Sequence, residues 1–184
     1  MVLEAFPNAT ILRPAPIYGA EDKLLLRYAA IIHHSDKIPL LTRAQRFQPV
    51  WVGDVAGAVA SAVVDSNTKG KIYELGGPLT ITDYSLAGVM CEAMYDKDLR
   101  VQMSDEQFKK MLKWKQFSIP WRRWYPADLY DQMQCDLLVN SDALTFKDLG
   151  ITPSTLNDHF QHVVRVRDQF LQSTSTEVNV FEKF

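Results

Sequence analysis

The chain has 184 residues, of which 47% are hydrophobic and 23% are charged, so it is long and apolar enough to bury a substantial core. Its formal net charge of −2 gives no overall basic surface, which argues against nucleic acid as a general partner. Two widely separated cysteines, Cys91 and Cys135, form no CxxC motif and argue against a disulfide framework or a cysteine zinc site.

The first predicted elements are the end of a helix and a buried strand. Residues 2–6 are typical of a helix tail that Pro7 stops, and residues 9–12 form a short, continuously apolar strand. A strand that is apolar on both faces indicates a parallel sheet. Residues 22–34 have apolar side chains at helical spacing and predict a helix that is buried on more than one side.

A sharp turn follows the first strand. Pro14, Pro16 and Gly19 lie directly behind it, at the strand end where open α/β sheets bind their ligands. Ala15 and Ile17 have a backbone N–H that the prolines lack, so this turn can present a donor to a ligand. The other interpretation is an ordinary connection between a strand and a helix.

The next predicted elements are a strand, a helix and a second strand. Residues 47–52 predict a strand, and residues 55–64 predict a helix whose small side chains can lie close to a sheet. We expect Asp54 to cap this helix rather than to act as a catalytic acid. Residues 71–75 alternate as a strand, and residues 76–78 indicate a turn, because a phosphate cradle needs more backbone amides.

Two capping boxes indicate further helix starts. Thr80 and Asp83 have the spacing of a capping box and predict a helix that ends before a short strand at residues 99–103. Ser104 and Gln107 form the second capping box. The chain therefore continues to alternate between helices and strands, which predicts an α/β fold.

A basic and aromatic segment covers residues 109–125. It carries six lysines and arginines, no acidic residue, and three of the four tryptophans of the chain. A solvated basic face does not need tryptophans, so this composition favours a protein interface, then a membrane headgroup surface, then internal packing, with single-stranded nucleic acid least favoured. The residues expected to dock on a partner or membrane are Trp114, Trp121, Arg122, Arg123 and Trp124.

The C-terminal part is less regular. Residues 114–141 are irregular, and residues 155–172 predict a last amphipathic helix before a polar tail. His159 and His162 are spaced i, i+3 in this helix and could share a metal ion. No neighbouring acid or cysteine completes such a site, which favours a solvated or capping role and no metal.

Four sequence blocks occur in a characteristic order: RPAPIYGAED, PVWVGDVAGAVASAV, GKIYELGGPLTITDYSL and FKDLGITPSTLNDHF. Together they resemble the second half of the extended short-chain dehydrogenase/reductase family. Arg13-Pro14, Ile17-Tyr18-Gly19 and the preceding VLEAFPNATIL are most similar to its atypical branch, which contains the nucleotide-binding accessory subunit of mitochondrial respiratory complex I.

The resemblance implies the C-terminal portion of an extended Rossmann-type, NAD(P)-binding fold with a small mixed α/β domain. Residues 1–66 would belong to the Rossmann-like domain, residues 67–172 to the small domain and residues 173–184 to a tail. Only one or two strands fit a central parallel sheet, so another chain or a missing segment would complete it. The glycine-rich loop and the catalytic Tyr-x-x-x-Lys of the family are absent from this sequence, so we expect no catalytic residues and no hydride transfer by this chain alone.

The function that the resemblance implies is a non-catalytic accessory subunit of complex I, which supports assembly around a bound NADPH-type nucleotide. The expected cofactor-binding residues are Pro14, Ala15, Pro16, Ile17 and Tyr18. Their backbone would reach the nicotinamide end, and a chain with the N-terminal Rossmann half would hold the phosphates. The alternative is half of an active dehydrogenase or epimerase acting on a nucleotide sugar, and a third interpretation is a binding module that has lost its cofactor.

The same resemblance implies a place on the matrix side of the mitochondrial inner membrane. The expected partners are complex I subunits near the junction of the matrix arm with the membrane, and anionic lipid. No apolar run approaches the roughly 18 residues that span a bilayer. We therefore expect a peripheral attachment.

Overall fold

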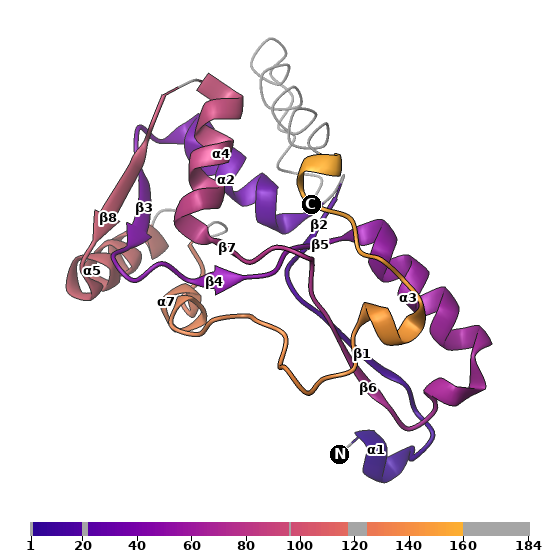
Figure 1. The fold of residues 1–184 in the computed structure, drawn as a ribbon. Helices are drawn as coiled ribbons and strands as arrows, with labels where there is room; N and C mark the ends of the chain where they lie inside the picture. The colour runs from indigo at the N-terminus through magenta and orange to yellow at the C-terminus, as the bar shows by residue number, and fades with distance from the viewer. Residues whose placement is uncertain (1, 20–21, 96, 118–124, 160–184) are drawn as a thin grey trace. The chain divides into compact units, whose positions relative to one another are not determined.

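The structure is a computed structural model. The residues that it describes are 2–19, 22–95, 97–117 and 125–159 (Figure 1). They divide into two compact units, which are residues 2–19, 46–81 and 137–159 in unit 1 and residues 22–45 and 82–136, as far as described, in unit 2. Three strand pairs of the described residues are parallel, and helices lie between the strands along the chain, which confirms the predicted α/β class. The domain boundaries expected at residues 66 and 172 stay a prediction.

Unit 1 contains two parallel strand pairs. β1 (Ile11–Pro14) pairs with β6 (Ile72–Leu75), and β2 (Ile17–Tyr18) pairs with β5 (Val50–Trp51). The two longer strands confirm the strands expected at these places. Because β1 and β6 are parallel, their carboxyl ends meet at the same edge of the sheet, where the predicted turn leaves β1.

The single strand expected over residues 47–52 is wrong. The chain there forms β4 (Arg46–Phe47) and β5, with Gln48 and Pro49 between them. Pro49 has no N–H to donate to a ladder, so a continuous strand is interrupted at that position.

α3 (Val52–Val64) begins three residues before the start that the sequence indicates, because Trp51 occupies the N-cap position without a side-chain hydrogen bond. The expectation that Asp54 caps this helix is therefore wrong. The Asp54 carboxylate instead accepts hydrogen bonds from the backbone N–H of Ser154 at 2.7 Å and from its hydroxyl at 3.2 Å. This link ties the first turn of α3 to the end of unit 1.

One core cluster holds unit 1 together. Its buried members are Val50, Ala58, Tyr73, Leu75 and Phe146. The remaining helical turns of the unit are α1 (Val2–Ala5), η1 (Ser66–Thr68), η2 (Phe146–Leu149) and η3 (Asn157–His159). Of the helix expected over residues 155–172, the part from residue 160 onward lies outside the described residues, and so does His162.

Unit 2 packs helices around a third parallel pair. Its elements are α2 (Lys23–His34), β3 (Ile38–Leu41), α4 (Asp83–Tyr95), β8 (Arg100–Met103), α5 (Asp105–Gln116) and α7 (Leu129–Met133), with β3 paired to β8. α2 packs against α4, and six of its residues are buried, which confirms the prediction of burial on more than one side. The side chain of Asp22 caps α2 by accepting the N–H of Leu25.

The two expected capping boxes have different outcomes. Ser104 and Gln107 form both bonds of a capping box at the start of α5, as predicted. The box expected at residues 80–83 is wrong, because the hydroxyl that caps the start of α4 belongs to Thr82, which accepts the Ser85 N–H at 3.0 Å. β7 (Ile81–Thr82) keeps the chain extended up to that point and so moves the cap by two residues.

Candidate functional site

The Pro14–Tyr18 turn passes directly from β1 to β2. The Ala15 N–H donates to the Leu75 carbonyl at 2.9 Å, which extends the β1–β6 ladder by one bond. The expectation that Ala15 presents a free donor to a ligand is therefore wrong, because the sheet already uses that N–H.

Ile17 remains the backbone donor of this turn. The Val50 N–H donates to the Pro16 carbonyl at 3.1 Å, and Ile17 lies opposite Val50 in the register. In a parallel ladder Val50 therefore bonds with the residues on either side of Ile17, and the Ile17 N–H points away from β5. Ile17 is also 36% exposed, so a ligand can approach it.

Tyr18, in contrast, is turned into unit 1. Only 1% of it is exposed, its hydroxyl donates to the Thr155 carbonyl at 3.1 Å, and its ring centroid lies 5.5 Å from that of Trp51. Burial, together with the nearby charges of Asp54 and Asp158, raises the pKa of Tyr18 to about 12. The phenol is thus a structural group, and its hydroxyl is engaged within the protein.

His159 belongs to the same aromatic cluster. Its ring stacks on Trp51 with centroids 4.0 Å apart and an interplanar angle of 13°. The solvated or capping role expected for His159 is therefore wrong, because the indole offers it a stacking surface. No group of three or more histidine, cysteine or acidic side chains among the residues described could hold a metal ion.

A cleft of about 320 Å³ lies beside the turn. We call it the β1 cleft, and its lining residues are Arg13, Pro14, Ala15, Pro16, Glu74, Leu137, Leu138, Val139 and Asn140. One wall is therefore the rigid proline turn, and the facing wall is a mostly apolar segment of residues 137–140. Such a site, with few polar groups and a fixed backbone, is typical of small-molecule binding.

Three polar side chains meet at the β1 cleft. Glu74 accepts hydrogen bonds from the Asn140 backbone at 3.0 Å and from its amide at 3.1 and 3.0 Å. The Arg13 guanidinium lies 3.8 Å from Glu74 and its side chain is 59% exposed. An exposed guanidinium beside an apolar wall can bind a phosphate or an amide oxygen of a ligand.

The wall at residues 137–140 is positioned by Gln48 and Gly77. The Gln48 side chain accepts the Val139 N–H at 2.8 Å, and the Gly77 N–H donates to the Gln48 carbonyl at 3.1 Å. A Cβ atom at Gly77 would lie 1.9 Å from the Pro49 carbonyl oxygen, so only glycine fits this approach. Residues 76–78 act as a packed connection, as expected, rather than as a phosphate cradle.

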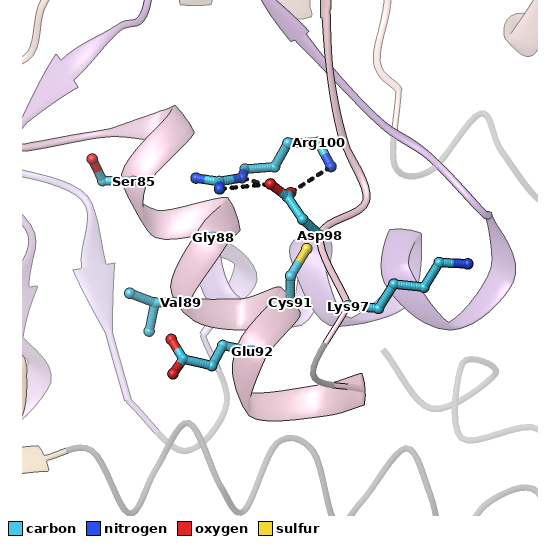
Figure 2. Close-up of a pocket in the computed structure, with 8 residues that line it drawn as sticks. All are labelled: Ser85, Gly88, Val89, Cys91, Glu92, Lys97, Asp98 and Arg100. Carbon is cyan, nitrogen blue, oxygen red and sulfur yellow. Dashed lines mark hydrogen bonds and ion pairs between the residues drawn. The ribbon is translucent and has the colours of Figure 1, made fainter.

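Unit 2 has a separate cleft of about 340 Å³, formed by α4 and the start of β8 (Figure 2). Arg100 lies over Gly88 and donates two hydrogen bonds of 2.8 Å to Asp98, while its guanidinium lies 4.2 Å from the Tyr84 ring centre. These bonds lower the pKa of Asp98 to about 2. Burial raises the pKa of the Cys91 thiol, so this thiol is not an activated nucleophile.

The described part of the basic and aromatic segment consists of residues 109–117, on α5 and its C-cap, and of Tyr125, which is buried. Phe108 and Leu112 are buried, whereas Trp114 is 73% and Phe117 is 90% exposed. The expectation that Trp114 is available for docking therefore agrees with its exposure. The other four expected docking residues, Trp121, Arg122, Arg123 and Trp124, lie outside the described residues.

No family model matches the chain. It is 33% identical over 167 residues to the mitochondrial NADH dehydrogenase (ubiquinone) 1 alpha subcomplex subunit 9 of Arabidopsis thaliana, covering 86% of this chain and 42% of that protein. It is 31% identical over 171 residues to the mitochondrial NADH-ubiquinone oxidoreductase 40 kDa subunit of Neurospora crassa, covering 90% and 43%. The chain thus spans less than half the length of these curated relatives.

Solved structures show the fold. A dTDP-glucose 4,6-dehydratase from Streptomyces venezuelae, with NAD and TYD bound, has a TM-score of 0.58 at 19% identity, covering 86% of this chain and 43% of its own. A triphenylmethane reductase from Citrobacter sp., complexed with NADP(H), has a TM-score of 0.53 at 19% identity, covering 76% and 48%. The chain is therefore homologous, over about two fifths of their length, to these mitochondrial complex I subunits, and it has the Rossmann-like fold of the extended short-chain dehydrogenase/reductases.

Proposed function

We propose that this chain is all or part of a non-catalytic accessory subunit of mitochondrial NADH–ubiquinone oxidoreductase (complex I). The observation that carries the proposal is the similarity to two differently named subunits of that enzyme over 86% and 90% of the chain. Tyr18, at the end of the turn beside the β1 cleft, donates its hydroxyl to the Thr155 carbonyl, so this tyrosine has a structural role in the proposal.

The test is to attach an affinity tag to the chain in its native cells, purify it under mild conditions and identify the accompanying proteins by mass spectrometry. Complex I subunits should dominate, and the chain should migrate with complex I on native gels. A chain that migrates alone, or with an unrelated set of proteins, would overturn the proposal.

The β1 cleft and the Ile17 N–H support a second part of the proposal, that this chain contacts the nicotinamide end of an NADPH-type nucleotide. A chain or segment with the N-terminal Rossmann half would hold the phosphates. Ligands of open α/β sheets bind at the carboxyl ends of the strands, which is where this turn lies. Arg13 and the proline turn would fix the end of the ligand from one side.

Calorimetry tests whether the nucleotide site is shared with another chain or is complete in this chain alone. We expect no measurable NADPH binding by the isolated chain and clear binding by the purified assembly. Arg13→Ala should weaken binding by the assembly, whereas Arg43→Ala, which removes an exposed arginine of unit 2, should not. Tight binding by the isolated chain would contradict the shared site.

The position proposed within the cell is peripheral, on the matrix side of the inner membrane, with the basic and aromatic segment facing the membrane-proximal part of complex I. Within the described residues, no helix is both long and apolar enough to cross a membrane. Exposure of Trp114 on a lysine-rich helix supports docking through this segment. Alanine substitution of Trp121, Arg122, Arg123 and Trp124 should reduce incorporation into the assembly on native gels, and unchanged incorporation would contradict this position.

A further inference from the structure

α5 presents an exposed stripe that covers its last turns and its C-cap residue, Phe117. Lys110, Lys113, Trp114 and Phe117 are spaced i, i+3, i+4 and i+7, so they share one side of the helix, which we call the α5 face. Phe108 and Leu112 are buried on the opposite side. The helix is therefore held to unit 2 by one side while the α5 face points to solvent.

Charge is separated along the same helix. The acidic residues of α5, Asp105 and Glu106, both lie in its first turn, and Asp105 accepts a hydrogen bond of 2.9 Å from the hydroxyl of Tyr130. All charged residues in the later turns of α5 are lysines. The ammonium group of one of them, Lys109, lies 4.2 Å from the centre of the Tyr130 ring. The end of the helix that bears Trp114 and Phe117 is thus basic.

The composition of the whole segment, which includes two arginines, favours a protein interface, but the α5 face combines its aromatic side chains with lysines alone, and this favours a membrane surface. Protein interfaces are enriched in tryptophan but depleted in lysine. At a bilayer surface both residue types have a favourable place, because aromatic rings enter the headgroup boundary while lysine stems extend and keep their ammonium groups among the phosphates. Two aromatic residues as exposed as Trp114 and Phe117 would bury apolar area there.

We propose that the α5 face docks on anionic phospholipid headgroups at a bilayer surface. The inference rests on the proposed peripheral position of the chain and names the contact that holds it there. Lys110 and Lys113 bind the phosphates, and Trp114 and Phe117 insert at the level of the headgroups. Contact of the same face with an acidic protein subunit is the other outcome that the test resolves.

The test uses the full chain and two kinds of vesicle, pure phosphatidylcholine and phosphatidylcholine mixed with phosphatidylglycerol. Flotation should recover the chain with the mixed vesicles only, and added salt should release it. A lysine near an anionic surface contributes roughly a factor of five to binding, so Lys110→Ala with Lys113→Ala should weaken partitioning by roughly thirtyfold. The double variant Trp114→Ala with Phe117→Ala should bind the mixed vesicles more weakly than the wild type at every salt concentration.

A matched control removes the same charge elsewhere. Lys69→Ala with Lys71→Ala changes two exposed lysines of unit 1 and should bind vesicles nearly as the wild type does. Circular dichroism and melting curves show whether each variant keeps its fold. Failure of the folded wild type to bind mixed vesicles, or equal loss in the α5 and control variants, would overturn the inference.

The proposed function can fail separately. If the chain co-purifies with complex I and the α5 variants lose that association without any vesicle binding by the wild type, the α5 face meets a protein and the lipid inference is wrong. If the chain binds vesicles but never co-purifies with complex I, the lipid inference stands and the proposed function is wrong.

Discussion

Glu74 holds the two walls of the β1 cleft together, because its carboxylate receives three hydrogen bonds from Asn140 while it lies on β6. The two residues are 66 positions apart, so no local pattern in the sequence indicates this pair. Arg13 was identified within a motif, but its ion-pair partner was not. The walls of the cleft therefore emerged only from the structure.

Glu74→Ala should destabilise the protein. The change removes the acceptor of three hydrogen bonds whose Asn140 donors water can reach, and the expected loss in the free energy of unfolding is about 0.5–1.5 kcal/mol. Urea denaturation followed by circular dichroism measures it. Asp36→Ala, which removes an exposed carboxylate from a loop of unit 2, should change the free energy by no more than about 0.5 kcal/mol. Equal effects of the two variants would show that Glu74 does not hold the cleft.

Because of Tyr18, we expect the stability of the folded protein to fall at alkaline pH. Its pKa is about 12 in the folded protein and 10.0 ordinarily, so the folded state holds this proton more tightly than the unfolded state does. The stabilisation is complete below about pH 10 and is lost as the pH rises through about 12. Tyr18→Phe should reduce the loss of stability over this range, as measured by melting curves at successive pH values.

Other buried tyrosines set the control for that measurement. Burial also raises the pKa of Tyr28 and Tyr73, so some alkaline loss should remain in Tyr18→Phe. Tyr84→Phe changes a half-buried tyrosine and should keep most of the wild-type pH dependence. An identical alkaline profile for wild type and Tyr18→Phe would contradict the role given to Tyr18.

At the scale of elements, the sequence predicts two helix starts correctly, and in both the capping residues are close together in the chain. Asp22 marks the start of α2, and the Ser104–Gln107 box marks the start of α5, because a cap needs only residues three positions apart. The start of α3 was missed because Trp51 caps it without a side-chain bond. Burial of Tyr18 was missed because its acceptor, Thr155, is 137 residues away.

Gly77 is the residue on which the connection after β6 depends. Gly77→Ala would place a Cβ atom against the Pro49 backbone, which cannot move without breaking the β2–β5 pair, so a loss of about 1–3 kcal/mol is expected. Gly57→Ala is the matched control, because the nearest atom to its Cβ is 3.8 Å away and the site is within α3. That control should leave stability unchanged or raise it by up to about 1 kcal/mol in urea denaturation.

At the scale of the whole molecule, unit 1 shows two features of an incomplete parallel sheet. In the described part of the chain β1 pairs with β6 alone, so its other edge has no neighbouring strand. α3 also has an exposed apolar side, on which Val59 is 48% and Val63 is 80% exposed. Parallel sheets are normally covered on both faces and several strands wide. Completion of the sheet by another chain or segment stays a prediction, and it would account for both features.

Val63→Lys tests that completion. Val63 is already largely exposed, so the change should alter the stability of the isolated chain by no more than about 0.5 kcal/mol. If a partner with the first Rossmann half covers α3, the buried lysine charge should weaken their association strongly, as measured by co-purification of the two tagged chains. Leu79→Lys, at another exposed apolar residue of unit 1, is the control and should leave co-purification intact. Normal association of Val63→Lys would show that α3 faces solvent in the assembly, and that only the β1 edge receives the partner.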